Sequence, residues 1–70
     1  MRRRPVESSA LLSVGYDERS RILEVEFVSG EIYHYFDVSP AEAAALLRAG
    51  SMGRFLNEEI KPRHRYQHRP

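Results

Sequence analysis

The residues best suited to contact a ligand in this sequence are tyrosines and basic side chains. Tyr33 and Tyr35 lie two apart in a segment rich in aromatic and β-branched residues, and Tyr66 lies among arginines near the C-terminus. Tyrosine rings on a small sheet can stack on unpaired bases while neighbouring cations hold phosphates. The basic candidates for such a surface are Arg54, Lys61, Arg63 and Arg65. These seven residues are the predicted nucleic-acid-binding set.

The two central tyrosines also have a structural interpretation. A chain of 70 residues with no tryptophan and three phenylalanines needs bulky rings to fill its core. Tyrosine can do this while its hydroxyl stays at the edge of the core. The sequence leaves open whether Tyr33 and Tyr35 are core or binding surface, and we expect at least one of them to be mostly buried.

The acidic residues show no pattern typical of an active site. Glu24 and Glu26 lie two apart in a predicted strand, and Glu58 and Glu59 are neighbours in a predicted helix. Neither pair places two carboxylates across a cleft at the separation that glycoside hydrolysis needs. The chain also has no phosphate-binding loop and no Gly-x-Ser-x-Gly nucleophile motif. We therefore predict that the protein is not an enzyme.

The three histidines do not predict a metal site. His64 and His68 are four residues apart, but the proline-bounded, arginine-rich segment around them does not predict a helix, and no acidic third ligand follows. His34 has no clustered partner, and we expect it on the solvent-facing side of its strand near Glu24. We therefore predict no metal and no cofactor.

Length and composition limit the class of protein. Seventy residues, of which 41% are hydrophobic, allow one small domain. The absence of cysteine excludes a disulfide framework, a thiol enzyme and a cysteine-ligated zinc module. No apolar run reaches the roughly 18–20 residues of a membrane span, and no signal-peptide core follows the N-terminal arginines. A soluble, cytoplasmic domain without a membrane partner is the expectation.

The net charge of +1 hides an uneven distribution. Residues 1–4 hold three arginines and residues 61–70 hold four basic side chains, so the two ends together carry +7. The body, residues 5–60, holds four arginines and all ten acids and carries −6. Such asymmetry indicates either contact with an acidic partner such as nucleic acid or solubilising ends.

Three segments in the first half predict strands. They span residues 10–17, 21–28 and 31–38. Each alternates apolar and polar side chains or is rich in β-branched and aromatic residues. In the first segment, Leu12 is expected to share a face with Val14. Short polar connections between the segments predict an antiparallel meander.

The loop before the third strand sets its register. A three-residue loop, which needs a positive φ only at Gly30, suits the sequence better than a two-residue loop. It pairs Val25 with Tyr33 and Leu23 with Tyr35, so both tyrosines share a face with the apolar side chains of the second strand. A slip by one residue would turn them to the opposite face.

The second half predicts two short helices. Ser39 as N-cap, Pro40 at the first helical position and Glu42 at the third form a capping box. Gly50 lies where a left-handed C-terminal cap is expected. Ser51 can then cap the second helix, which ends before proline 62 because the residue before a proline resists helical geometry.

Two glycines flank the start of this second helix. Gly50 and Gly53 could expose backbone amides to an anion, but their ordinary role is to cap one helix and permit a sharp turn into the next. We therefore assign a structural role to both glycines. The full predicted structural set is Gly30, Ser39, Pro40, Gly50 and Gly53.

Two amphipathic helices need an apolar sheet face to cover them. The predicted fold is therefore α+β: a three-stranded antiparallel β-meander packed on two short C-terminal helices. Residues 8–62 form the single domain, residues 1–7 a basic N-terminal arm, and residues 63–70 a basic C-terminal tail. The tail is either partly docked through Tyr66 or disordered.

Five ordered blocks also carry a resemblance to a known family. They are Val14-Gly15-Tyr16-Asp17, Leu23-Glu24-Val25-x-Phe27, Gly30-x-x-Tyr33-x-Tyr35, Val38-x-Pro40 and Ser51-x-Gly53-x-Phe55-x-Asn57-x-x-Ile60. Through these blocks the sequence resembles the KTSC domain family of small bacterial domains, which also occurs at the C-terminus of some lysyl-tRNA synthetases. The resemblance implies a domain of unknown function, and the attachment to a synthetase suggests RNA binding.

Two functions remain after these exclusions. The first is a small non-enzymatic module that binds RNA or single-stranded nucleic acid through the seven predicted residues. The alternative is a protein-interaction or accessory domain, because a three-stranded meander has two free edges. Self-association through an edge would make the protein a weak homodimer rather than a monomer.

Overall fold

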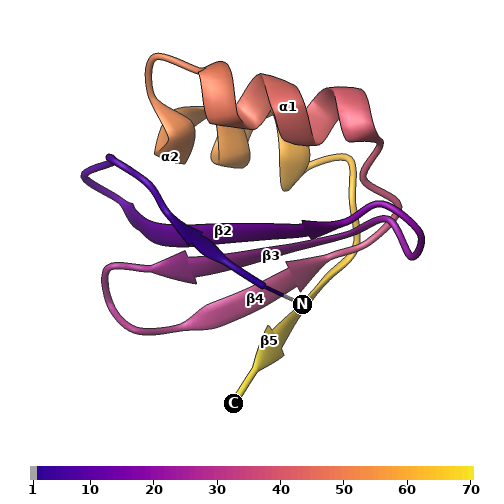
Figure 1. Cartoon of the computed structure of the whole chain (residues 1–70), viewed down its shortest axis with the longest axis horizontal. Helices are drawn as coiled ribbons and strands as arrows, with labels where there is room; N and C mark the ends of the chain where they lie inside the picture. Colours follow the sequence, from indigo (N-terminus) through magenta and orange to yellow (C-terminus); the bar gives the residue numbers. More distant parts are fainter. Residues whose placement is uncertain (1) are drawn as a thin grey trace.

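The computed structural model describes residues 2–70 as one antiparallel sheet with helices over one of its faces (Figure 1). Met1, the first residue of the expected arm, lies outside the described residues. The five strands are β1 (Arg4–Pro5), β2 (Leu11–Asp17), β3 (Ile22–Phe27), β4 (Ile32–Tyr35) and β5 (Tyr66–Arg69). They follow one another across the sheet in chain order. The α+β class is confirmed, and the prediction of three strands is wrong.

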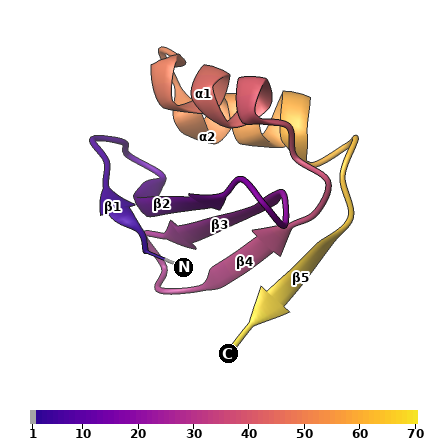
Figure 2. The same cartoon turned by 45° about the vertical axis from the view of Figure 1, so that its right-hand side comes forward.

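The two unpredicted strands come from the two ends of the chain. β1 lies in the expected arm and β5 in the expected tail, and Figure 2 shows them at opposite edges of the sheet. Arg4 is opposite Val14, and Tyr66 is opposite Tyr35. The side chains of both strands are exposed. Because backbone hydrogen bonds alone can hold an edge strand, neither segment needs the apolar alternation by which strands are recognised in a sequence.

The predicted register of the central strands is present. Leu23 is opposite Tyr35, and Val25 is opposite Tyr33. Gly30 has φ 95°, the left-handed conformation that the loop requires. Its N–H donates to the Phe27 carbonyl at 2.8 Å. The turn therefore places both tyrosines on the apolar face of the sheet.

The start of β2 departs from the expected alternation. The pairing of β2 with β3 shifts between Leu11 and Ser13, as at a β-bulge. Leu11 is fully buried, whereas Leu12 is 46% exposed. The prediction that Leu12 shares a face with Val14 is therefore wrong. Leu12 is the extra residue of the bulge, so Leu11 rather than Leu12 lies on the same face as Val14.

Helix α1 (Pro40–Arg48) begins with a complete capping box. The Glu42 N–H donates to Ser39 Oγ at 3.1 Å, and the Ser39 N–H donates to Glu42 Oε1 at 3.0 Å. At the other end the chain leaves the helix through Ala49, which is extended. Among residues 2–70, Gly30 is the only glycine with a positive φ. The left-handed cap expected at Gly50 is therefore wrong, because the helix ends by extension one residue earlier.

Helix α2 (Met52–Phe55) continues directly into a π-helical turn, η1 (Leu56–Ile60). Ser51 Oγ accepts from the Arg54 N–H at 3.3 Å and so caps α2. Gly53 lies against the residue that precedes β2: a Cβ at position 53 would come within 2.8 Å of Ala10 Cβ. The missing side chain therefore permits the close approach of α2 to the sheet.

The core lies between the helices and the face of the sheet that they cover. Leu23 and Val25 of β3, Leu46 of α1, and Leu56 and Ile60 of η1 are fully or almost fully buried there. The opposite face of the sheet carries polar side chains, so the domain has two layers. No helix within residues 2–70 is long and apolar enough to cross a membrane.

Candidate functional site

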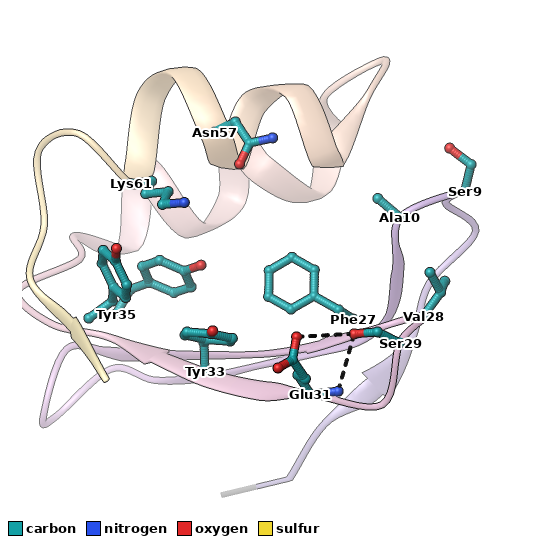
Figure 3. A pocket seen from close by; sticks show the side chains of 11 residues that line it. Ser9, Ala10, Phe27, Val28, Ser29, Glu31, Tyr33, Tyr35, Asn57 and Lys61 are labelled. Atoms are coloured by element: carbon teal, nitrogen blue, oxygen red, sulfur yellow. Dashed lines mark hydrogen bonds between the residues drawn. The ribbon is translucent and has the colours of Figure 1, made fainter. Parts of the chain in front are cut away.

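An open groove of about 550 Å³ lies between the sheet and η1 (Figure 3). We call it the aromatic groove. Its principal lining residues are Phe27, Glu31, Tyr33, Asn57, Lys61 and Tyr66. Strands β3, β4 and β5 supply the rings, and η1 together with the residue that follows it supplies Asn57 and Lys61. The groove is concave and largely apolar with a few polar groups, as small-molecule and base-binding sites usually are.

Tyr33 is the centre of the ring cluster in this groove. Its ring centroid lies 5.6 Å from that of Phe27 at an interplanar angle of 87°, 5.9 Å from that of Tyr66, and 5.1 Å from that of His68. The β4–β5 register explains the cluster, since His68 is opposite Tyr33 and Tyr66 is opposite Tyr35. The unpredicted strand β5 therefore completes the aromatic surface.

Burial separates the tyrosines into two roles. Tyr35 is 3% exposed, and its burial, with smaller effects of Tyr33 and Tyr66, raises the pKa of its hydroxyl to about 12. Tyr66 is 47% exposed, and Tyr33 is half-buried. The expectation that at least one central tyrosine is mostly buried is confirmed. Tyr35 fills the core, while Tyr33 and Tyr66 present their rings to the groove.

The four predicted cations do not converge. Lys61 lines the groove, with its Nζ 5.6 Å from the centre of the Tyr66 ring. The other three contact groups elsewhere. Arg54 Nε lies 3.1 Å from Glu58 Oε2, Arg63 Nη2 lies 3.5 Å from Glu59 Oε1, and the Arg65 guanidinium lies over the Phe36 ring. The groove therefore has one cation of the predicted four.

Three of the principal lining residues, Phe27, Glu31 and Asn57, were not in the predicted set, although the sequence contains a clue to each. Asn57 and Lys61 are four residues apart, the spacing that places two side chains on one helix face. Phe27 and Glu31 flank the β3–β4 turn, and the Phe27 N–H donates to the Glu31 carbonyl at 2.9 Å. The turn thus brings both beside Tyr33.

His64 has a structural position that the sequence did not indicate. Its side chain is 8% exposed, and both ring nitrogens face acceptors: Nδ1 lies 2.8 Å from the Phe36 carbonyl and Nε2 lies 2.7 Å from Glu42 Oε2. Burial alone would raise the pKa of the Glu42 carboxyl, but hydrogen bonds from Ser39 and His64 outweigh burial and lower it. His64 therefore joins the segment before β5 to the end of β4 and to the first turn of α1.

The face of the sheet away from the helices holds a polar network. Arg3 Nη1 lies 3.0 Å from Glu24 Oε1, and Arg3 Nε donates to Ser13 Oγ at 2.9 Å. His34 Nε2 lies 2.6 Å from Glu24 Oε2, as expected for a histidine beside this glutamate. Burial would raise the pKa of Glu24, but hydrogen bonds from His34 and Arg3 lower it overall. The network holds the N-terminal segment on the sheet.

The described residues contain no group of three or more histidine or acidic side chains placed to hold a metal ion. The two histidine–glutamate pairs lie apart from each other, one at Glu24 and one at Glu42, and neither glutamate lines the aromatic groove. Nothing in this arrangement positively indicates catalysis.

The fold and groove define a small α+β domain with a five-stranded antiparallel sheet, two helical segments on one face and an aromatic hollow between the layers. The profile of the KTSC domain matches residues 7–66, so this chain belongs to the KTSC domain family. The resemblance in the sequence is confirmed. The family is one of unknown function.

Relatives of this chain include both single domains and a larger enzyme. An uncharacterized protein of Stutzerimonas stutzeri (strain A1501) is 50% identical over 64 residues, which cover 91% of this chain and 90% of the relative. A lysine–tRNA ligase of Nostoc punctiforme is 33% identical over 61 residues, which cover 87% of this chain and 11% of the ligase. The crystal structure of a KTSC domain protein from Yersinia pestis matches with a TM-score of 0.93 at 35% identity, covering 99% of this chain and 97% of that one.

Proposed function

We propose that this domain is a non-enzymatic binding module for RNA or single-stranded nucleic acid and that the aromatic groove is its contact surface. The observation that carries the proposal is the gathering of the Tyr33 and Tyr66 rings beside Lys61 in one open groove. Aromatic rings stack on bases of any kind, and an adjacent cation holds the phosphate.

The dimensions of the groove favour an unpaired nucleotide. A hollow of about 550 Å³ accommodates a base but no base-paired helix, whose bases are already stacked on one another. With one cation in the groove, we expect a shallow salt dependence, with a slope of about −0.7 for each phosphate held. The relative that is a lysine–tRNA ligase supports RNA as the nucleic acid.

Tyr33→Ala tests the proposal. We expect it to weaken the binding of a short fluorescein-labelled RNA by about 10- to 100-fold in fluorescence anisotropy at low salt, because stacking of one base contributes about 1–3 kcal/mol. Tyr33→Phe keeps the ring and should bind like the parent protein. Lys61→Ala should weaken binding, and Arg54→Ala, which alters a cation outside the groove, should not. Absence of salt-sensitive binding by the parent protein would overturn the proposal.

The second candidate function is protein interaction through the free edge of β5. All four side chains of this strand are exposed, and within the described residues no strand lies beyond it. The Phe36 N–H donates to the Arg65 carbonyl. The backbone groups of Arg65 therefore face β4. In an antiparallel ladder every second residue does the same, so those of Gln67 and Arg69 also face β4, and those of Tyr66 and His68 point to the open edge. Another extended segment could pair there.

The charge of this edge opposes a second copy of the same strand. An antiparallel pair centred on Gln67 would place Arg65 opposite Arg69 of the other copy, and like charges directly opposite destabilise a sheet. We therefore expect a monomer in sedimentation equilibrium at every concentration tested. A dimer that is lost in His68→Pro would contradict this, because that substitution removes an N–H directed to the open edge.

A further inference from the structure

We infer that the aromatic groove selects guanine, with the Watson–Crick edge of the base at Glu31 and its phosphate toward Lys61. This inference rests on the proposed function and adds to it the kind of base and the direction in which the nucleotide lies. It begins from an asymmetry of the groove. Figure 3 places Glu31 beside Phe27, near the β3–β4 turn, and Lys61 near Tyr35, on the other side of Tyr33.

The Glu31 carboxylate keeps most of its capacity to accept hydrogen bonds. Its Oε1 receives one long hydrogen bond, from Ser29 Oγ at 3.4 Å. Within residues 2–70 it forms no ion pair, whereas Glu24, Glu42 and Glu58 are each held by a basic partner or a histidine. Glu31 is therefore a free anionic acceptor at the wall of an apolar groove.

This charge dictates the direction of a bound nucleotide. A phosphate beside Glu31 would be repelled, and a phosphate beside Lys61 would be attracted. The base edge must then meet the carboxylate, which only accepts hydrogen bonds. Charge-assisted bidentate pairing with a carboxylate needs two adjacent donors.

Guanine alone among the four RNA bases has two adjacent donors, N1–H and the N2 amino group, on its Watson–Crick edge. Adenine and cytosine present a ring-nitrogen acceptor next to their amino group, and this lone pair would face the carboxylate. Uracil presents one N–H between two carbonyl oxygens, which the carboxylate also repels. The free carboxylate therefore discriminates in favour of guanine over all three.

The rings provide a matching surface for a flat base. In Figure 3 the Tyr33 ring is seen nearly edge-on, so its face is turned toward η1, and Asn57 extends from η1 toward the same space. The Phe27 ring stands beside the Tyr33 ring at an interplanar angle of 87°. A base stacked on Tyr33 therefore has its position limited by Phe27 while its edge reaches Glu31.

The test is a titration of the full chain with four labelled short RNAs that differ only in one central base, G, A, C or U, and with guanosine monophosphate as a separate probe. We expect the G-containing RNA to bind about tenfold more tightly than the other three. Glu31→Gln should remove this preference and leave the fold intact, since the side chain is exposed. Glu18→Gln, which alters an exposed acid outside the groove, should keep it.

The outcomes separate the inference from the proposed function. Equal binding of the four RNAs, or a preference for guanine that survives Glu31→Gln, would overturn the inference and leave nucleic-acid binding in place. No binding to any RNA and none to guanosine monophosphate would overturn both. Binding of guanosine monophosphate that depends on Glu31 would support the inference and show that a free nucleotide is sufficient. Binding of the G-containing RNA with the same dependence on Glu31, but no binding of the mononucleotide, would support the inference and identify a strand as the ligand.

Discussion

His64→Ala should lower the free energy of unfolding by about 2–4 kcal/mol, a large part of the roughly 5–15 kcal/mol of a typical domain. The substitution removes a buried ring and leaves the Phe36 carbonyl and the Glu42 carboxylate without the ring nitrogens that now face them. It also releases the segment that leads into β5. Urea-induced unfolding at neutral pH, followed by circular dichroism, measures the change.

His68→Ala is the matched control, because this histidine lies in the same C-terminal segment but is exposed on an edge strand. Because His68 is exposed, His68→Ala should lower the free energy of unfolding by only about 0.5–1 kcal/mol, through loss of the ring contact with Tyr33. If the two alanine variants unfold at the same urea concentration, His64 does not hold the C-terminal segment in the way its contacts indicate.

Gly53→Ala should destabilise the protein by up to about 2 kcal/mol, although alanine is the better helix former by about 1 kcal/mol. The added methyl would lie 2.8 Å from Ala10 Cβ, and neither atom is the end of a flexible side chain. Overpacking of this kind costs about 1–3 kcal/mol, which exceeds the gain in helix propensity. Thermal and urea unfolding of the variant give the sign directly.

Two further variants isolate the cause. Ala10→Gly combined with Gly53→Ala should recover stability, because it removes the atom that the new methyl meets. Gly50→Ala should be neutral or slightly stabilising, since nothing lies within 4 Å of a Cβ there and its φ is not in the left-handed region. A Gly53→Ala protein more stable than the parent would show that α2 can move away from Ala10 at little cost.

The sequence by itself determined the features that depend on neighbouring residues. The Gly30 loop established that Tyr33 and Tyr35 share the apolar face, and the Ser39–Glu42 spacing established the start of α1. The ordered blocks of the sequence identified the family. Turn conformation, helix capping and strand alternation act over a few residues, so the pattern contains enough information to predict them.

The candidate site was predictable in part. Tyr33, Tyr35, Lys61 and Tyr66 were in the predicted set and line the groove. Arg54, Arg63 and Arg65 were in the same set but lie against other partners. Which cations meet the rings depends on how η1 and β5 pack on the sheet, and residue types do not contain that information.

Only the tertiary structure decided what the two ends of the chain do. β1 and β5 pair with the sheet through their backbones and lack the apolar alternation that marks a strand, so the sequence pattern of these basic segments did not predict them. The bulge that exposes Leu12 arises from the pairing of two strands. His64 meets Phe36 and Glu42 across 28 and 22 residues of sequence, and contacts over such separations are set by the packing of the whole chain. Packing of β5 against β4 likewise turned an apparent basic tail into one wall of the aromatic groove, because it placed Tyr66 beside Tyr33.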